Sequence, residues 1–150
     1  RLVTFLRRPM DQPPVRFYER LEPAVFVLRL VPGMRADIIP LLAPHYRALV
    51  LESFGVGGLP GGEHGEMFAA LRRWCESGRL AVFTTQVPHE GCDLAVYEVG
   101  RAVGELSGVL EARDMTPEAV AVKLMWALGQ TEDREKAARL FETPIEYDIM

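Results

Sequence analysis

Short apolar runs alternate with amphipathic segments along most of this chain. Four of the runs have the length and the β-branched content of buried strands, and they occupy residues 24–30, 48–53, 80–85 and 108–110. Near-continuous apolar character, as in AVFVLRL at 24–30, is typical of parallel strands that are covered on both faces. The pattern therefore predicts four buried strands.

Helical periodicity, in which apolar residues recur every three or four positions, follows each of these runs. The expected helices occupy residues 37–43, 63–77, 93–106, 119–128 and 131–141. Asp93 is the expected N-cap of the third helix. Thr116 is the expected N-cap of the fourth, with Pro117 at its first position and Gly129 at its end. Strands that alternate with helices, joined by right-handed crossovers, predict a three-layer α/β domain of the Rossmann or flavodoxin type with a four-stranded parallel sheet.

The segment before the first strand has a different composition. Residues 1–22 mix apolar residues with arginines and with Pro9, Pro13 and Pro14, which is typical of a linker. We therefore expect an interdomain linker at 1–22 and one α/β domain at 23–150. Because the sequence opens on Arg1 rather than Met, we also expect it to be a piece of a longer protein.

A glycine-rich loop follows the second apolar run. The sequence LVLESFGVGGLPGG places several glycines directly after a strand, at the end where α/β proteins bind ligands. They are Gly55, Gly57, Gly58, Gly61 and Gly62. We expect Gly57 to need a positive φ, which glycine adopts without steric cost. A sharp strand-to-helix turn explains the same glycines without a ligand, and neither a GxGxxG motif nor a P-loop is present.

The loops after the four strands are expected to share one edge of the sheet. Few residues there favour catalysis. Thr84 and Thr85 precede the third loop without a base placed beside them by the sequence, so a strand-end hydrogen bond is favoured over a nucleophile. His89 lies beside Glu90, and a surface role is favoured over a catalytic base. No metal-ligand spacing occurs, and no set of residues is a complete catalytic site.

Composition and charge limit the kinds of molecule that this chain is expected to bind and the compartment in which it is expected. The net charge of −4 and the pI of about 5.4 argue against nucleic acid or an anionic membrane as a partner. The apolar runs are too short to span a bilayer, and we expect a cytoplasmic protein. Cys75 and Cys92 form no metal or redox motif, so reduced and partly buried thiols are expected.

Three motifs carry a family resemblance. The runs ESFGVGGLP, TTQVPHEGCDLAVYEVGR and DMTPEAVAVKLMWALG occur in the order and spacing of one known domain, over residues 24–141. In them the chain resembles the C-terminal domain of cytoplasmic (type I) bacterial L-asparaginases. The resemblance implies an enzyme of two α/β domains that hydrolyses L-asparagine to aspartate and ammonia with a threonine nucleophile and without metal or organic cofactor.

The resemblance also implies where the chemistry lies. The family's catalytic TGGTI-type motif and its later Thr-Asp and Lys belong to the N-terminal domain, and neither motif occurs in these residues. The chain alone is therefore expected to be inactive, with that N-terminal domain and further copies in a dimer or tetramer as its partners. The role carried over to this domain is contact with a neighbouring subunit's site through Gly55, Gly57, Gly58 and Tyr97. Gly58 stands where many relatives have Asn.

Some type I enzymes also bind L-asparagine as an effector, at an Arg near the end of the second strand and a Thr-Gln-Cys at the end of the third. Here Thr85 and Gln86 match, whereas Glu52 and Val87 stand at the positions of the Arg and the Cys. A carboxylate at position 52 is expected to repel the ligand's α-carboxylate. Glu52, Thr85 and Gln86 remain the effector-binding candidates.

Two other functions stay open. One is a stand-alone module that binds asparagine or aspartate without catalysis. The other is the amidotransferase subunit that acts on misacylated tRNA, which shares the scaffold and which the acidic balance of this chain disfavours.

Overall fold

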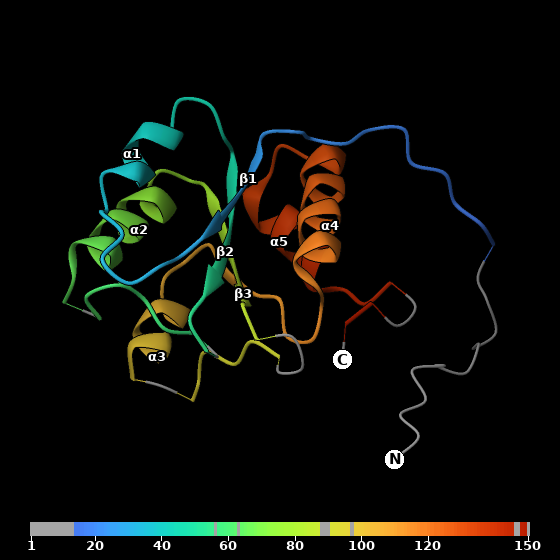
Figure 1. Ribbon diagram of the computed structural model, residues 1–150. Helices are drawn as coiled ribbons and strands as arrows, with labels where there is room; N and C mark the ends of the chain where they lie inside the picture. Colours follow the sequence, from blue (N-terminus) through green and yellow to red (C-terminus); the bar gives the residue numbers. More distant parts are fainter. Residues whose placement is uncertain are drawn as a thin grey trace, which may run out of the picture.

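The computed structural model describes residues 14–55, 57–62, 64–87, 91–96, 98–145 and 148–149, which form alternating strands and helices (Figure 1). The elements in chain order are β1 (Val25–Arg29), α1 (Ile38–Leu42), β2 (Ala48–Ser53), α2 (Glu66–Glu76), β3 (Leu80–Thr85), α3 (Glu98–Gly104), β4 (Val109–Glu111), α4 (Pro117–Gln130) and α5 (Arg134–Glu142). Within the described residues, no helix is both long and apolar enough to cross a bilayer.

The four strands form one parallel sheet in the order β1-β2-β3-β4, which confirms the predicted sheet. The register pairs Leu28 with Leu51, and Leu51 with Phe83. Each strand lies beside the one before it, so the order does not reverse within the described strands. The crevice that a reversal opens in doubly wound sheets therefore has no counterpart in this sheet.

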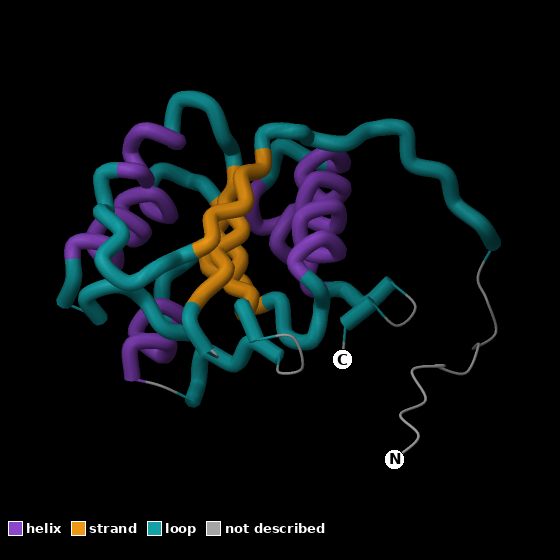
Figure 2. The backbone as a smooth tube through the Cα atoms, in the orientation of Figure 1, coloured by secondary structure: helices purple, strands orange, loops and turns teal. Residues whose placement is uncertain are grey.

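Helices cover the sheet on both faces, which gives the expected three layers (Figures 1 and 2). α1, α2 and α3 lie on one face, and α4 and α5 lie on the other. Alternate residues of β2 enter the two resulting cores: Leu49 and Leu51 pack toward α1 and α2, whereas Val50 packs toward α4. All six residues of β3 are buried, as the near-continuous apolar run predicted.

All five helices differ from the predicted bounds by a few residues, and the differences in α3 and α4 have local causes. α3 begins at Glu98 rather than Asp93, because the Asp93 carboxylate accepts the amide of Ala95 at 2.9 Å in a separate turn. α4 begins as predicted, with the Thr116 hydroxyl accepting the amide of Ala119 and Pro117 at the first position. However, it continues through Gly129 to Gln130, so the prediction that Gly129 ends the helix was wrong.

The close approach of another segment explains why residue 129 is a glycine although it lies within the helix. A Cβ on this residue would lie 2.5 Å from the carbonyl oxygen of Arg20, since the chain before β1 crosses α4 at this point. The Glu22 amide donates to the Met125 carbonyl at 2.9 Å, and the ring of Tyr18 meets that of Trp126 edge-on. The end of the segment expected as a linker thus lies against α4. The assignment of residues 1–22 to a linker stays a prediction, and residues 1–13 lie outside the described part.

Gly129→Ala is expected to release this segment from α4. Overpacking against the Arg20 carbonyl outweighs the gain in helix propensity, so the free energy of unfolding should fall by about 1 kcal/mol. Gly104→Ala, at an exposed helical position where the nearest atoms to a Cβ are 3.8 Å away, is the matched control and should be neutral or stabilising. Urea denaturation followed by tryptophan fluorescence measures both. Equal stability of the two variants would contradict the steric role of Gly129.

Candidate functional site at the carboxyl edge of the sheet

A cleft of about 380 Å³ lies at the carboxyl ends of the strands, between the sheet and the start of α4. It brings together three of the residues singled out in the sequence, Glu52, Thr85 and Gln86. Its other lining residues are Arg29, Val87, Asp114, Met115, Thr116, Pro117 and Glu118. We call it the carboxyl-edge cleft. The loops after the strands thus meet at one edge, as the α/β pattern predicted.

Arg29 is the residue of this cleft that sequence reasoning missed. It ends β1 and pairs in register with Glu52, and its Nη1 lies 3.5 Å from Glu52 Oε2. The Arg29 side chain is 63% exposed, whereas that of Glu52 is only 15% exposed. The Glu52 carboxylate, expected to repel an anionic ligand, therefore has a cation beside it. The available signal was the position of Arg29 near the end of an apolar run, which places it at the same edge.

The side chains of Thr85 and Gln86 already make hydrogen bonds within the chain. The Thr85 hydroxyl donates to the carbonyl of Gly55 and accepts the amide of Val87 at 3.0 Å. The Gln86 amide nitrogen donates to the carbonyls of Leu30 at 2.6 Å and Glu52 at 2.8 Å. Both residues line the cleft, and their side chains fasten the strand ends together.

The glycine loop, by which we mean the described residues Gly55, Gly57, Gly58, Gly61 and Gly62, is not part of the cleft lining, although the Gly55 carbonyl accepts the hydroxyl of Thr85, which lines it. Gly55 has φ 49° and Gly57 has φ 151°, so the expected positive φ at Gly57 is confirmed. Gly58 pairs with Phe54 in an isolated antiparallel bridge. Gly55, Gly57 and Gly58, expected to contact a neighbouring subunit, thus form one tight turn. Tyr97, assigned the same role, lies outside the described residues.

Neither threonine at the end of β3 fits a nucleophile. The Thr84 hydroxyl is buried and has no hydrogen-bond partner among the described residues, while that of Thr85 is held by Gly55. His45 and His64 are exposed, and His89 lies outside the described residues. Among the residues that the structure describes, no group of three or more His, Cys, Asp and Glu side chains could hold a metal ion.

Both cysteines are buried rather than partly buried as expected, and neither is in a disulfide. Burial raises the pKa of the Cys75 thiol to about 11 and that of the Cys92 thiol to about 12. Since the thiolate is the nucleophilic form, neither side chain is suited to nucleophilic chemistry near neutral pH.

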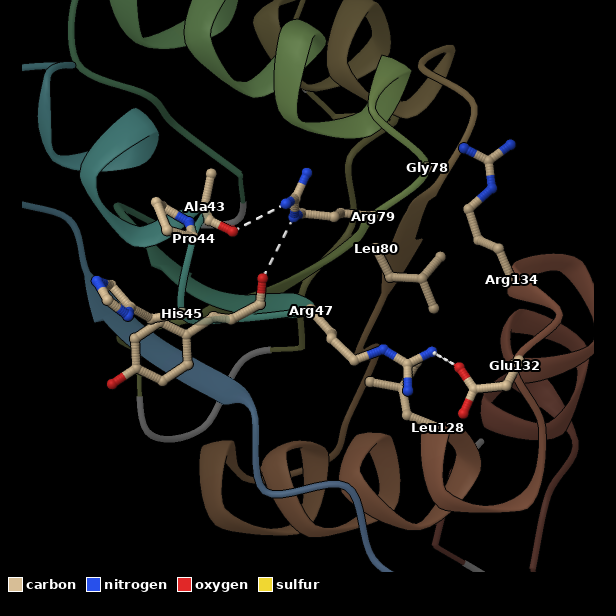
Figure 3. Close-up of a pocket in the computed structure, with 11 residues that line it drawn as sticks. Ala43, Pro44, His45, Arg47, Gly78, Arg79, Leu80, Leu128, Glu132 and Arg134 are labelled. Carbon is tan, nitrogen blue, oxygen red and sulfur yellow. Dashed lines mark hydrogen bonds and ion pairs between the residues drawn. The ribbon is translucent and has the colours of Figure 1, made fainter.

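A second cavity, of about 330 Å³, lies at the opposite edge of the sheet (Figure 3). Arg47, Arg79 and Arg134 contribute to its lining. Arg79 donates to the carbonyls of Ala43 at 2.8 Å and Tyr46 at 3.3 Å, as the dashed lines in Figure 3 show. Arg134 donates to the Cys75 carbonyl at 3.0 Å. These guanidinium groups satisfy carbonyls after α1 and near the end of α2, so the cavity is explained by the fold.

Arg47 has a different role at this edge. Its guanidinium lies 2.9 Å from Glu22 Oε2 and 2.8 Å from Glu132 Oε2, and it thereby joins the segment before β1 to the turn between α4 and α5. The amide of Ala24, which donates to Glu22 Oε1 at 3.0 Å, and the guanidinium of Arg47 hold the pKa of Glu22 below its ordinary value of 4.5. With these charges satisfied internally, the carboxyl-edge cleft is the stronger candidate for a functional site.

Comparison with known proteins agrees with this fold. Residues 24–141 match the family described as the glutaminase/asparaginase C-terminal domain, and the chain belongs to that family. The chain is 38% identical to the L-asparaginase of Thermococcus kodakarensis over 89% of its length and 40% of that protein. It is 36% identical to a subunit of the glutamyl-tRNA(Gln) amidotransferase from Metallosphaera sedula, over 86% of the chain and 28% of that protein.

Solved structures give the same result. The thermostable L-asparaginase from Thermococcus kodakarensis matches with a TM-score of 0.80 and 36% identity, covering 93% of this chain and 43% of that one. L-asparaginase I from Vibrio cholerae matches with a TM-score of 0.74 and 28% identity, covering 86% and 38%. The chain therefore spans less than half the length of these relatives.

Glu22→Gln is expected to lower the free energy of unfolding by about 1 kcal/mol at neutral pH, because it weakens charge-assisted hydrogen bonds. A carboxyl whose pKa is lowered on folding stabilises the fold above its unfolded pKa and loses that contribution as pH falls through the folded pKa. The difference between wild type and variant should thus shrink from about pH 4.5 downward. Urea titrations across this range measure it.

Glu132→Gln is the control, since Glu132 bonds the same guanidinium from an 89% exposed side chain and should contribute only a few tenths of a kcal/mol. A loss in Glu22→Gln that is equal at pH 3 and pH 7 would argue against a charged Glu22 in this contact.

Proposed function

We propose that this chain is the C-terminal domain of an L-asparaginase whose full-length form hydrolyses L-asparagine to L-aspartate and ammonia. The observation that carries the proposal is the 38% identity with the Thermococcus kodakarensis L-asparaginase over 89% of the chain, within a family match over 24–141. The catalytic threonines belong to a preceding domain in this proposal. The environments of Thr84 and Thr85 agree with this proposal. The Thr84 hydroxyl is buried, and the Thr85 hydroxyl is hydrogen-bonded to the Gly55 carbonyl.

In this proposal the domain contributes contacts between the subunits of an oligomer. The glycine loop, with Tyr97, would contact the site of a neighbouring subunit in a homodimer or tetramer. The open space beside Gly55, where no atom lies within 4 Å of the place of a Cβ, favours such a role because it allows close approach of another surface, whereas Leu94 and Phe54 of the same chain occupy that place at Gly57 and Gly58. The absence of a side chain at Gly58 removes one polar contact from that approach.

The first experiment measures ammonia release from L-asparagine by the full-length protein and by the 150-residue chain. The proposal expects turnover by the first and none by the second. Activity of the chain alone would place the catalytic groups within these residues. Inactivity of a folded full-length protein would overturn the asparaginase assignment.

A second candidate function is that of an amidotransferase subunit. It is favoured by the 36% identity with the glutamyl-tRNA(Gln) amidotransferase subunit from Metallosphaera sedula. The same ammonia assay separates the two when it is repeated with and without glutamyl-tRNA(Gln). Release that does not need the tRNA supports the asparaginase. Release that depends on it supports the amidotransferase subunit.

The carboxyl-edge cleft supports a further part of the proposal, binding of a free amino acid as an effector or, if the chain acts alone, as a binding module. An amino acid carries an α-carboxylate and an α-ammonium group. Arg29 and Glu52, 3.5 Å apart, offer one partner for each. In this assignment the Glu52 carboxylate binds the α-ammonium group. The guanidinium of Arg29, at the end of β1, binds the α-carboxylate.

Arg29→Gln is expected to weaken L-asparagine binding to the chain by about tenfold or more, because one charge-assisted contact is lost. The measurement is an NMR titration with L-asparagine, with D-asparagine as the stereochemical control, followed at Glu52, Thr85 and Gln86. Arg72→Gln on α2, whose guanidinium pairs with Glu76, is the matched surface control. No stereoselective shifts at millimolar ligand would leave the domain with a scaffolding role only.

A further inference from the structure

Two adjacent threonines at the end of β3 have opposite environments. Thr84 pairs in register with Glu52, is 1% exposed, and has a hydroxyl without a hydrogen-bond partner among the described residues. Thr85 points to the other face of the sheet, is 9% exposed, and uses its hydroxyl twice. That hydroxyl donates to the Gly55 carbonyl and accepts the Val87 amide. The side chain of Thr85 therefore joins the end of β3 to the first residue of the glycine loop.

Neighbouring bonds hold the strand end that carries Thr85. The Gln86 amide donates to the Ser53 carbonyl at 3.2 Å, and the Gln86 side chain bonds the carbonyls of Leu30 and Glu52. These bonds fix the carboxyl ends of β1, β2 and β3 relative to one another. The Thr85 hydroxyl is thus presented to Gly55 from a rigid support.

Leu94 holds the glycine loop from another side. Its side chain is 2% exposed, and a Cβ on Gly57 would lie 2.9 Å from Leu94 Cδ2. The Leu94 backbone is itself fixed, because its amide donates to Glu111 Oε1 at 3.2 Å and α3 approaches it closely at Gly100. The loop is therefore restrained at Gly55 by Thr85 and at Gly57 by Leu94.

We propose that Thr85 is a positioning residue, whose hydroxyl, together with the packing of Leu94, keeps the glycine loop in one preformed conformation. Gly55 and Gly57 have a large conformational freedom that the fold must restrain. A loop already restrained in the free domain meets a ligand or subunit without a further ordering cost. The restraint rests on contacts within this chain. Only the use of the loop at a neighbouring site rests on the proposed function.

The test compares Thr85→Val with Thr84→Val, a control of the same residue type, strand and size, by amide hydrogen exchange of the 150-residue chain. Thr85→Val removes both hydrogen bonds and should speed exchange about tenfold at Gly57 and Gly58, whose amides donate to the Phe54 carbonyl. Thr84→Val removes an unpartnered hydroxyl and should leave these amides unchanged. Thr85→Ser keeps the hydroxyl and should restore slow exchange.

Equal exchange at Gly57 and Gly58 in Thr85→Val and Thr84→Val would overturn the proposal. Amides of Val50 and Val82 in the same spectra report whether the sheet remains folded. If Thr85→Val unfolds the chain, Leu94→Ala gives the second test. It should speed exchange at Gly57 while the Thr85 bonds remain, and unchanged exchange there would also overturn the proposal. Failure of the full-length protein to release ammonia would overturn the proposed function and leave this exchange result standing.

Discussion

β2 and β3 lie in the middle of a parallel sheet with helices against both faces, and the rest of the domain depends on that double burial. Two neighbouring parallel strands must be joined by a crossover connection, because the chain has to return to the same edge of the sheet before the next strand begins. In this domain the crossovers contain helices. Because all four strands run in the same direction, their following loops meet at one edge. The carboxyl-edge cleft and the glycine loop are direct results of this arrangement.

The two edges of the sheet use charge differently. At the amino edge, Arg79 and Arg134 satisfy main-chain carbonyls near the ends of helices, and Arg47 joins two carboxylates. At the carboxyl edge, the exposed guanidinium of Arg29 has one long contact with Glu52 and lies in a cleft. The arginines at the amino edge are therefore structural, because the chain itself supplies their hydrogen-bond partners. Arg29 has a guanidinium that is still exposed for a ligand.

The sequence allowed β2 and β3 to be predicted to the residue, because long apolar runs buried on both faces have few alternatives. The start of α4 was predictable from Thr116 and Pro117, whose effects are local. Gly129 and Asp93 were misassigned, since one responds to the approach of Arg20 and the other caps a short turn. At the candidate site, the edge was predictable from the pattern, and the family resemblance pointed to Glu52, Thr85 and Gln86, which line the cleft there.

The place of Arg29 near the end of the first apolar run put it at this edge, but its pairing with Glu52 was not predictable, because register between strands decides which side chains become neighbours. The internal bonds of Thr85 and Gln86 were missed for the same reason, since their acceptors are distant in sequence. Local signals thus identified the elements. Contacts between neighbouring strands determined the hydrogen-bond and ion-pair partners of the side chains at the edge of the sheet.

The order in which the faces of the sheet are covered has a consequence for synthesis of the chain. Strands in sequential order let each βα unit dock beside the previous one as it emerges from the ribosome. The second face, with Val50, Leu80 and Val82, is covered by residues of α4, α5 and the segment after them. A nascent chain that stops before Pro117 would therefore expose an apolar sheet face, and chaperone binding or aggregation is the expected fate of such a product.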